Sequence, residues 1–187
     1  MLLMSDRESV FKSIENLFNT KGIFSAAHVR EVVDPSSSGG FVSLLLPEEL
    51  QKQRRSTLLS LKKNFLGNYW ETAILEALAY AAFYKVYPGA ILEEIRKICS
   101  GKALTYGGHR NHLGNFYRAS AEFGDLSPQR VCQLWTYKHI DFFMEVENGA
   151  PLRGEEGVLS RVADIVLYSA LGQCMDDNCG VFPKGNS

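Results

Sequence analysis

The chain has 187 residues, of which 45% are hydrophobic and 22% charged, and its formal net charge is −1. These are ordinary values for a globular protein, and the length suits one compact domain, or one domain with an extension, that can bury a hydrophobic core. The net charge argues against general attraction to nucleic-acid backbones, although it does not exclude a local basic patch. The four cysteines are scattered. They do not resemble the framework of a secreted disulfide-rich protein, and we expect a reducing, cytoplasmic location.

The beginning of the chain predicts helices and a loop. Ser5 and Glu8 have the spacing of a capping box and predict a first helix, and a short helix follows over residues 25–33. The opening residues turn polar too early for a signal peptide, and no apolar run approaches the roughly 20 residues that cross a bilayer. Residues 35–40, PSSSGG, predict a loop and the best domain boundary. Residues 41–46 predict either a short strand or an extended lead-in.

The rest of the chain has strong helix signals. Pro47 suits a first helical turn, Pro88 and Gly89 break a helix, and Ser127 before Pro128 is typical of a helix start. The sequence predicts helices over residues 47–65, 68–86, 90–100, 109–123, 128–147 and 155–177. We therefore expect an all-α protein, with residues 1–40 as an N-terminal helical extension and residues 41–187 as a helical bundle domain.

Charged residues interrupt two apolar helices. Residues 158–171, VLSRVADIVLYSAL, carry Arg161 and Asp164 as their only charges. A helix that is apolar nearly all round is normally buried, and a buried charge is costly unless it is paired, hydrogen-bonded or bound to a metal. Lys138 lies in the apolar stripe of the preceding helix, which contains Val131, Leu134, Trp135 and Phe142. If the two helices pack antiparallel, we expect an inward polar layer formed by Lys138, Asp141, Glu145, Glu156, Arg161 and Asp164.

Two interpretations of this layer stay open on residue type and spacing alone. Carboxylates on facing helices of a bundle can hold a divalent metal, and added lysine and arginine suit a phosphate ligand. Alternatively, Arg161 and Asp164 form a structural ion pair, and Lys138 extends its charged end to solvent.

A pattern over residues 90–175 bears on this choice. Its elements, in chain order, are Tyr106-Gly107, Asn115-Phe116, Arg118, Leu126-Ser127-Pro128, Lys138, and Arg161, Asp164 and Tyr168. In order and spacing they resemble the small phage and bacterial branch of the MazG-like all-α nucleotide pyrophosphohydrolase superfamily. The resemblance implies Mg²⁺-dependent hydrolysis of a (deoxy)nucleoside triphosphate to a monophosphate and pyrophosphate. It also implies a homo-oligomer, at least a dimer.

The resemblance also implies roles for individual residues. The catalytic residues would be Asp164, Glu156 and Lys138, and Mg²⁺ would be held by Asp164, Glu156, Asp141 and Glu145. Lys138 and Arg118 would clamp phosphate oxygens, and Tyr106 or Trp135 would stack on the base. The substrate-binding set would be completed by Arg161, Asn115 and Tyr168.

The acidic residues depart from the family pattern. Such enzymes carry Glu-x-x-Glu on one helix and Glu-x-x-Asp on the next, whereas here Lys138 and Asp141 stand on the first helix and Arg161 stands three residues before Asp164. Besides Glu156 and Glu145, Glu93 and Glu94 are candidate substitutes. The reduced acidic set favours a rival hypothesis, a non-enzymatic helical protein acting by protein contact or nucleotide sequestration. In both hypotheses the partners are a nucleotide or protein, and neither a membrane nor nucleic acid.

Three weaker patterns have simpler interpretations. His109, His112, Cys174 and Cys179 could be combined into a zinc set, but the C-x4-C spacing is loose and we expect incidental side chains. Cys132 lies in mid-helix and predicts core packing. The basic residues between 52 and 63 predict a solvated helix side, the alternative being contact with nucleic acid or an acidic partner.

Overall fold

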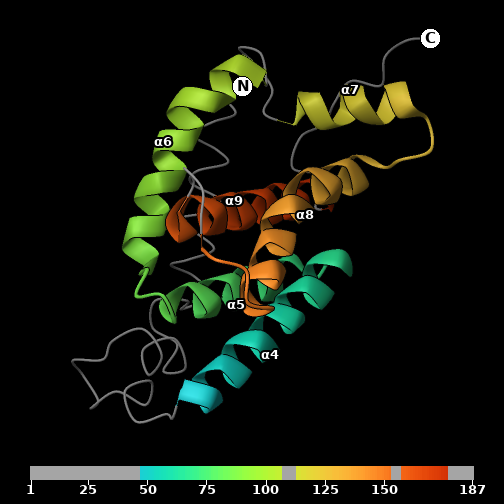
Figure 1. Ribbon diagram of the computed structural model, residues 1–187. Helices are drawn as coiled ribbons and strands as arrows, with labels where there is room; N and C mark the ends of the chain where they lie inside the picture. The colour runs from blue at the N-terminus through green and yellow to red at the C-terminus, as the bar shows by residue number, and fades with distance from the viewer. Residues whose placement is uncertain (1–46, 107–112, 153–156, 177–187) are drawn as a thin grey trace.

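The computed structural model describes residues 47–106, 113–152 and 157–176, without the side chains of residues 100–106. Within these ranges the chain forms helices and no strand, as Figure 1 shows, which confirms the all-α prediction for this part. The N-terminal extension, the serine–glycine loop and residues 41–46 lie outside the described residues. The helices are α4 (Pro47–Leu66), α5 (Trp70–Ala82), α6 (Pro88–Tyr106), α7 (Gly114–Phe123), α8 (Pro128–Glu147) and α9 (Val158–Asp176).

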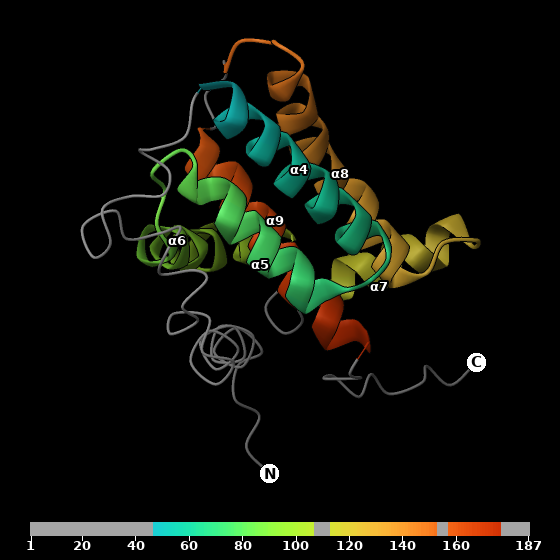
Figure 2. The same ribbon diagram turned by 90° about the horizontal axis from the view of Figure 1, so that it is seen from below.

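Helix α9 is the centre of the arrangement. It packs against α5, α6 and α8, and α4 packs against α5 and α8 (Figures 1 and 2). Helix α6 runs crosswise to α9, whereas α7 rests mainly on α8 and projects from the bundle. This topology surrounds α9 on most sides and leaves its polar residues close to α6 and α8.

Helix α9 is both long and apolar. By length and composition it could cross a membrane, with a mean hydropathy of 1.2 over the best stretch, so the expectation that no run reaches this length is corrected. However, 72% of that stretch is buried inside the bundle. Burial against three neighbouring helices is the usual reason for such an apolar sequence, and α9 is a core helix in this structure.

A close approach fixes α5 against α9. A Cβ atom added at Gly172 would lie 2.7 Å from two ring atoms of Trp70, so only glycine fits where the α9 backbone meets the indole. The Trp70 indole N–H donates a hydrogen bond to the Asp176 carboxylate at the end of α9. These contacts join the first residue of α5 to the last two turns of α9.

Local signals explain where several helices begin and end. Helix α8 has the predicted bounds, because Ser127 accepts a hydrogen bond from the Arg130 backbone N–H at 3.2 Å and Pro128 is the first helical residue. Helix α5 ends at Ala82 rather than at residue 86, and Lys85 follows in the left-handed conformation with φ of 59°.

Two other helices differ from their predicted bounds. Helix α6 begins at Pro88, because proline at a first helical position has no N–H that needs an intrahelical partner, and it continues to Tyr106 instead of ending at residue 100. Helix α7 begins at Gly114 rather than at residue 109.

Candidate functional site

A row of polar residues interrupts the buried surface of α9. Ser160, Arg161, Asp164 and Tyr168 follow one another at spacings of one, three and four residues, which places them along one side of the helix. Ser160, Arg161 and Tyr168 are partly accessible, whereas the residues between them, from Val162 to Leu167, are buried. We call these four residues the α9 polar strip.

Asp164 is the buried acidic residue of the strip. Its side chain keeps 10% exposure, and its Oδ2 lies 3.4 Å from Nε2 of His139, a buried residue of α8. The prediction that Asp164 points into the protein is therefore confirmed. The sequence analysis did not identify His139, which is three residues before Phe142 and four before Phe143. These spacings place the three side chains on one side of the helix, and they were the available signal that His139 is buried.

A second carboxylate reaches the strip from α6. Glu94 accepts a hydrogen bond through Oε1 from the hydroxyl of Ser160 at 3.0 Å, and its Oε2 lies 3.6 Å from Nζ of Lys97. Because Ser160 and Asp164 are one turn apart on α9, this contact places Glu94 beside the first turn of the strip. Glu94 was one of the substitute carboxylates that the sequence suggested.

Aromatic side chains adjoin both ends of the strip. The Arg161 guanidinium carbon lies 3.8 Å from the ring centroid of Phe142 on α8, a cation–π contact that holds the arginine in place. At the other end, Tyr168 meets Phe116 of α7 edge-on at 5.9 Å, and Phe116 contacts Trp135 at 5.3 Å. We call Tyr168, Phe116 and Trp135 the aromatic ledge. Trp135 is 41% exposed, so its indole is available for contact with a ligand.

The expected inward layer is wrong for its three residues on α8. Lys138, Asp141 and Glu145 are exposed on the outer side of α8. The sequence interpretation placed Leu134 and Trp135 in the buried stripe, but both are exposed. The face of α8 that packs inward consists instead of Val131, Cys132, Gln133, Thr136, His139, Ile140, Phe143 and Glu147. This change of face turns the three charged residues to solvent.

The other predicted residues are not all brought to the strip. Arg118 is exposed on α7, and the side-chain oxygen of Asn115 accepts a hydrogen bond from the Phe116 backbone N–H at 3.0 Å, which is a local contact at the start of that helix. Glu156 and the side chain of Tyr106 lie outside the described residues. So do His109, His112 and Cys179 of the zinc set that the sequence did not favour.

The donor atoms for a metal are few in the described part of the chain. Within it, no group of three or more histidine, cysteine, aspartate or glutamate side chains is arranged to hold a metal ion. Cys132 is not a candidate ligand or nucleophile, because burial raises the pKa of its thiol and its Sγ contacts the Tyr168 backbone carbonyl at 3.3 Å. This geometry agrees with the predicted core packing of Cys132.

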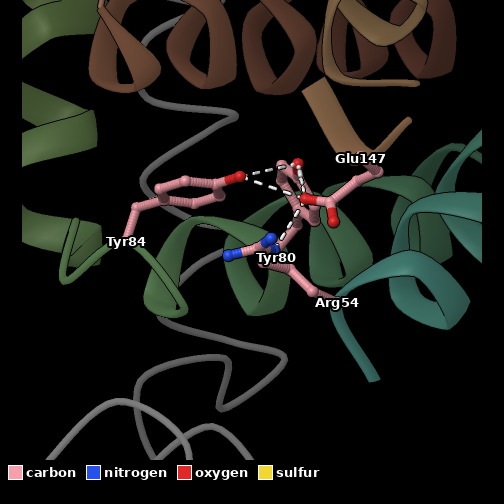
Figure 3. A network of polar contacts seen from close by, with 4 residues as sticks. All are labelled: Arg54, Tyr80, Tyr84 and Glu147. Carbon is pink, nitrogen blue, oxygen red and sulfur yellow. Dashed lines mark hydrogen bonds and ion pairs between the residues drawn. The ribbon is translucent and has the colours of Figure 1, made fainter. Parts of the chain in front are cut away.

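A larger buried polar cluster lies away from the strip, where α4, α5 and α8 meet. Glu147 Oε1 accepts hydrogen bonds from the hydroxyls of Tyr80 at 2.8 Å and Tyr84 at 3.0 Å (Figure 3). Nε of Arg54 lies 2.7 Å from the same oxygen, and the Glu147 side chain is 1% exposed. We call these four residues the Glu147 cluster.

The charges of the Glu147 cluster are mutually compensated. Burial lowers the pKa of Arg54, but the contact with Glu147 outweighs it and the net direction is upward. Burial also raises the pKa of Tyr80 and Tyr84, so both hydroxyls stay protonated and donate. No metal-binding group of side chains is found in the described residues, and we interpret the cluster as a structural connection between three helices. The sequence analysis missed it, because Tyr84 and Tyr80 are 63 and 67 residues away from Glu147 along the chain.

Comparison of the chain with protein-family models, curated proteins and solved structures finds no match. A function is therefore inferred from the residues of the α9 polar strip and from the MazG-like pattern over residues 90–175.

Proposed function

We propose that the α9 polar strip binds the phosphates of a nucleoside triphosphate. In this proposal the protein adds water across the bond between the α and β phosphates, releasing a nucleoside monophosphate and pyrophosphate. The observation that carries the proposal is the strip itself, a partly accessible row of polar residues on a helix that is otherwise buried. Asp164, the one clean acidic match to the MazG-like pattern, lies within this row.

The residues of the strip suit a phosphate ligand. Arg161 presents a permanent positive charge one turn from Asp164, and its contact with Phe142 limits the freedom that the side chain would lose on binding. A guanidinium can donate two parallel hydrogen bonds to phosphate oxygens. Arg161 is therefore the residue of this chain that we assign to the triphosphate.

The aromatic ledge suits the base of the nucleotide. Trp135 presents an exposed indole, and Phe116 and Tyr168 connect it to the strip through ring contacts of 5.3 and 5.9 Å. Stacking on an aromatic face accepts every base. We therefore assign Trp135 to base stacking, with no preference among bases.

The resemblance implies magnesium, and the donor chemistry of the strip suits that ion. Mg²⁺ in nucleotide sites is usually held by one or two carboxylates, with waters and substrate phosphates as the remaining ligands. Asp164 and Glu94 provide two carboxylates from helices that pack together, α9 and α6. In the proposal these two residues hold Mg²⁺, which would neutralise phosphate charge and activate water.

Nucleotide binding without turnover is the second candidate. It is favoured by the lack of any group of three metal-ligating side chains among the described residues, together with the outward positions of Asp141 and Glu145. A protein of this kind would retain the nucleotide contacts of Arg161 and Trp135 but would sequester the ligand.

Pyrophosphate release separates the two candidates. The purified protein is incubated with Mg²⁺ and a panel of standard and modified (d)NTPs, and pyrophosphate and monophosphate are measured. We expect turnover that is lost in Asp164→Asn and retained in Asp125→Asn, a matched change at an exposed residue outside the site. Saturable binding without pyrophosphate would establish the second candidate. Equal turnover in Asp164→Asn and wild type would reject the assignment of Asp164, provided that both variants have the wild-type unfolding midpoint.

A further inference from the structure

Helix α4 presents a basic face to solvent. Its residues are Lys52, Arg55, Lys62 and Lys63, which follow one another at spacings of three, seven and one residues and therefore lie along one side of the helix. Lys62 is partly exposed and the other three are exposed. We call these four residues the basic face of α4. It extends over about 17 Å at the rise of an α-helix.

Lys62 interacts electrostatically with Asp141 of α8, whereas the other three charges of this face have no ion-pair partner among the described residues. No ion pair joins Lys52, Arg55 or Lys63 to a carboxylate, although ion pairs are made by Arg54 in the same helix and by Arg96 and Lys97 in α6. The acidic residues of α4 are confined to its first turn, at Glu48 and Glu49. A chain whose formal net charge is only −1 thus concentrates uncompensated positive charge on one helix.

Two aromatic rings lie at the C-terminal end of the basic face. Tyr69 is 64% exposed, and its ring lies against Gly67, where an added Cβ would be 2.9 Å from two ring atoms and 3.2 Å from the Lys63 carbonyl oxygen. The glycine therefore allows the Tyr69 ring to lie next to the last turn of α4. On the neighbouring helix α8, the Tyr137 ring lies 5.3 Å from Nζ of Lys62.

We propose that the basic face of α4, with Tyr69 and Tyr137, binds single-stranded nucleic acid. Cations in a row contact successive phosphates, and exposed aromatic rings stack on unpaired bases, a combination typical of single-strand binding without sequence preference. An acidic peptide would use the cations but would gain little from the rings. A duplex keeps its bases stacked in its interior and likewise offers nothing to Tyr69. The proposal is independent of nucleotide hydrolysis at the α9 polar strip.

Salt dependence gives the expected size of the effect. If all four cations contact phosphates, the logarithm of the binding constant falls with the logarithm of salt concentration with a slope of about −2.8 for a single strand. A fourfold rise in salt then weakens binding roughly 50-fold. Replacing two of the cations by glutamine should reduce the slope to about −1.4 and the weakening to about sevenfold.

The experiment measures fluorescence anisotropy of labelled single-stranded oligo-dT and oligo-rU with the full chain. The variant Lys52→Gln/Arg55→Gln is compared with Lys85→Gln/Arg96→Gln, which removes the same charge from exposed positions outside the basic face of α4. We expect binding by wild type and by the control, a halved salt slope in the α4 variant, and weaker binding in Tyr69→Leu. Asp164→Asn should bind like wild type, since the α9 polar strip is a different site.

Each of the following results would overturn the proposal. They are absence of binding at low salt, equal loss in the α4 variant and the control, and competition by polyglutamate as effective as by unlabelled oligonucleotide. Equal affinity for the duplex form of the same sequence would also contradict it, because the stacking of unpaired bases would then contribute nothing.

Discussion

Replacing Glu147 by glutamine should destabilise the fold through the Glu147 cluster. The change keeps the size of the side chain and an acceptor for Tyr80 and Tyr84, but it removes the negative charge 2.7 Å from Nε of Arg54. Removing one partner of a buried ion pair costs about 3–5 kcal/mol when the other charge is left in the interior. The Arg54 side chain is 24% exposed, so water recovers part of that cost. We expect a loss of about 2–3 kcal/mol in the free energy of unfolding.

Urea unfolding followed by circular dichroism measures this loss. For a chain of this size it corresponds to a decrease in Tm of roughly 4–12 °C. The control Glu145→Gln changes an exposed carboxylate on the same helix and should stay within about 0.5 kcal/mol of wild type. In the double variant Arg54→Met/Glu147→Gln, the loss in free energy of unfolding should be smaller than the sum of the two single losses. Each single substitution leaves one buried charge without its partner, whereas the double variant removes both charges. A Glu147→Gln loss as small as that of the control, or strictly additive losses, would show that the ion pair between Arg54 and Glu147 does not stabilise the fold.

Two further predictions concern stability. Gly172→Ala should destabilise the protein by about 1–2 kcal/mol in urea unfolding, because overpacking against Trp70 costs about 1–3 kcal/mol and the helix propensity of alanine recovers only part of it. Gly89→Ala, where an added Cβ meets nothing within 4 Å, is the control and should not destabilise. Because burial raises the pKa of Tyr80 and Tyr84 above the ordinary 10.0, the folded state keeps protons that the unfolded chain loses near pH 10. Stability should therefore be complete below that pH and fall above it, by up to about 1.4 kcal/mol per pH unit for each tyrosine. The Tyr80→Phe/Tyr84→Phe variant should show a shallower fall, and an unchanged slope would contradict the protonated state of these hydroxyls.

Several features of the fold could be predicted from local sequence signals. The bounds of α8 could be predicted from Ser127 and Pro128, because capping is decided by neighbouring residues. The burial of Asp164 could be predicted from the apolar residues on every side of it in α9. Both features depend on chain positions within a few residues of each other.

The site was less predictable, because it depends on which face of a helix turns inward. Leu134 and Trp135 suggested one inward face of α8, whereas the structure turns a different face inward and exposes Lys138. The rotation of α8 is decided by α4, α7 and α9 together, and no local pattern encodes it. The Glu147 cluster was missed for the same reason, since Arg54 and Tyr80 reach Glu147 only through tertiary packing.

Nucleotide titration of tryptophan fluorescence tests most directly whether the α9 polar strip is a nucleotide site. The chain has two tryptophans, of which Trp70 is buried and Trp135 is exposed on the aromatic ledge. We expect saturable quenching by a nucleoside triphosphate that disappears in Trp135→Phe and weakens at least tenfold in Arg161→Met. Quenching that persists unchanged in both variants, or no spectral change with any triphosphate of the panel, would contradict a nucleotide site at α9.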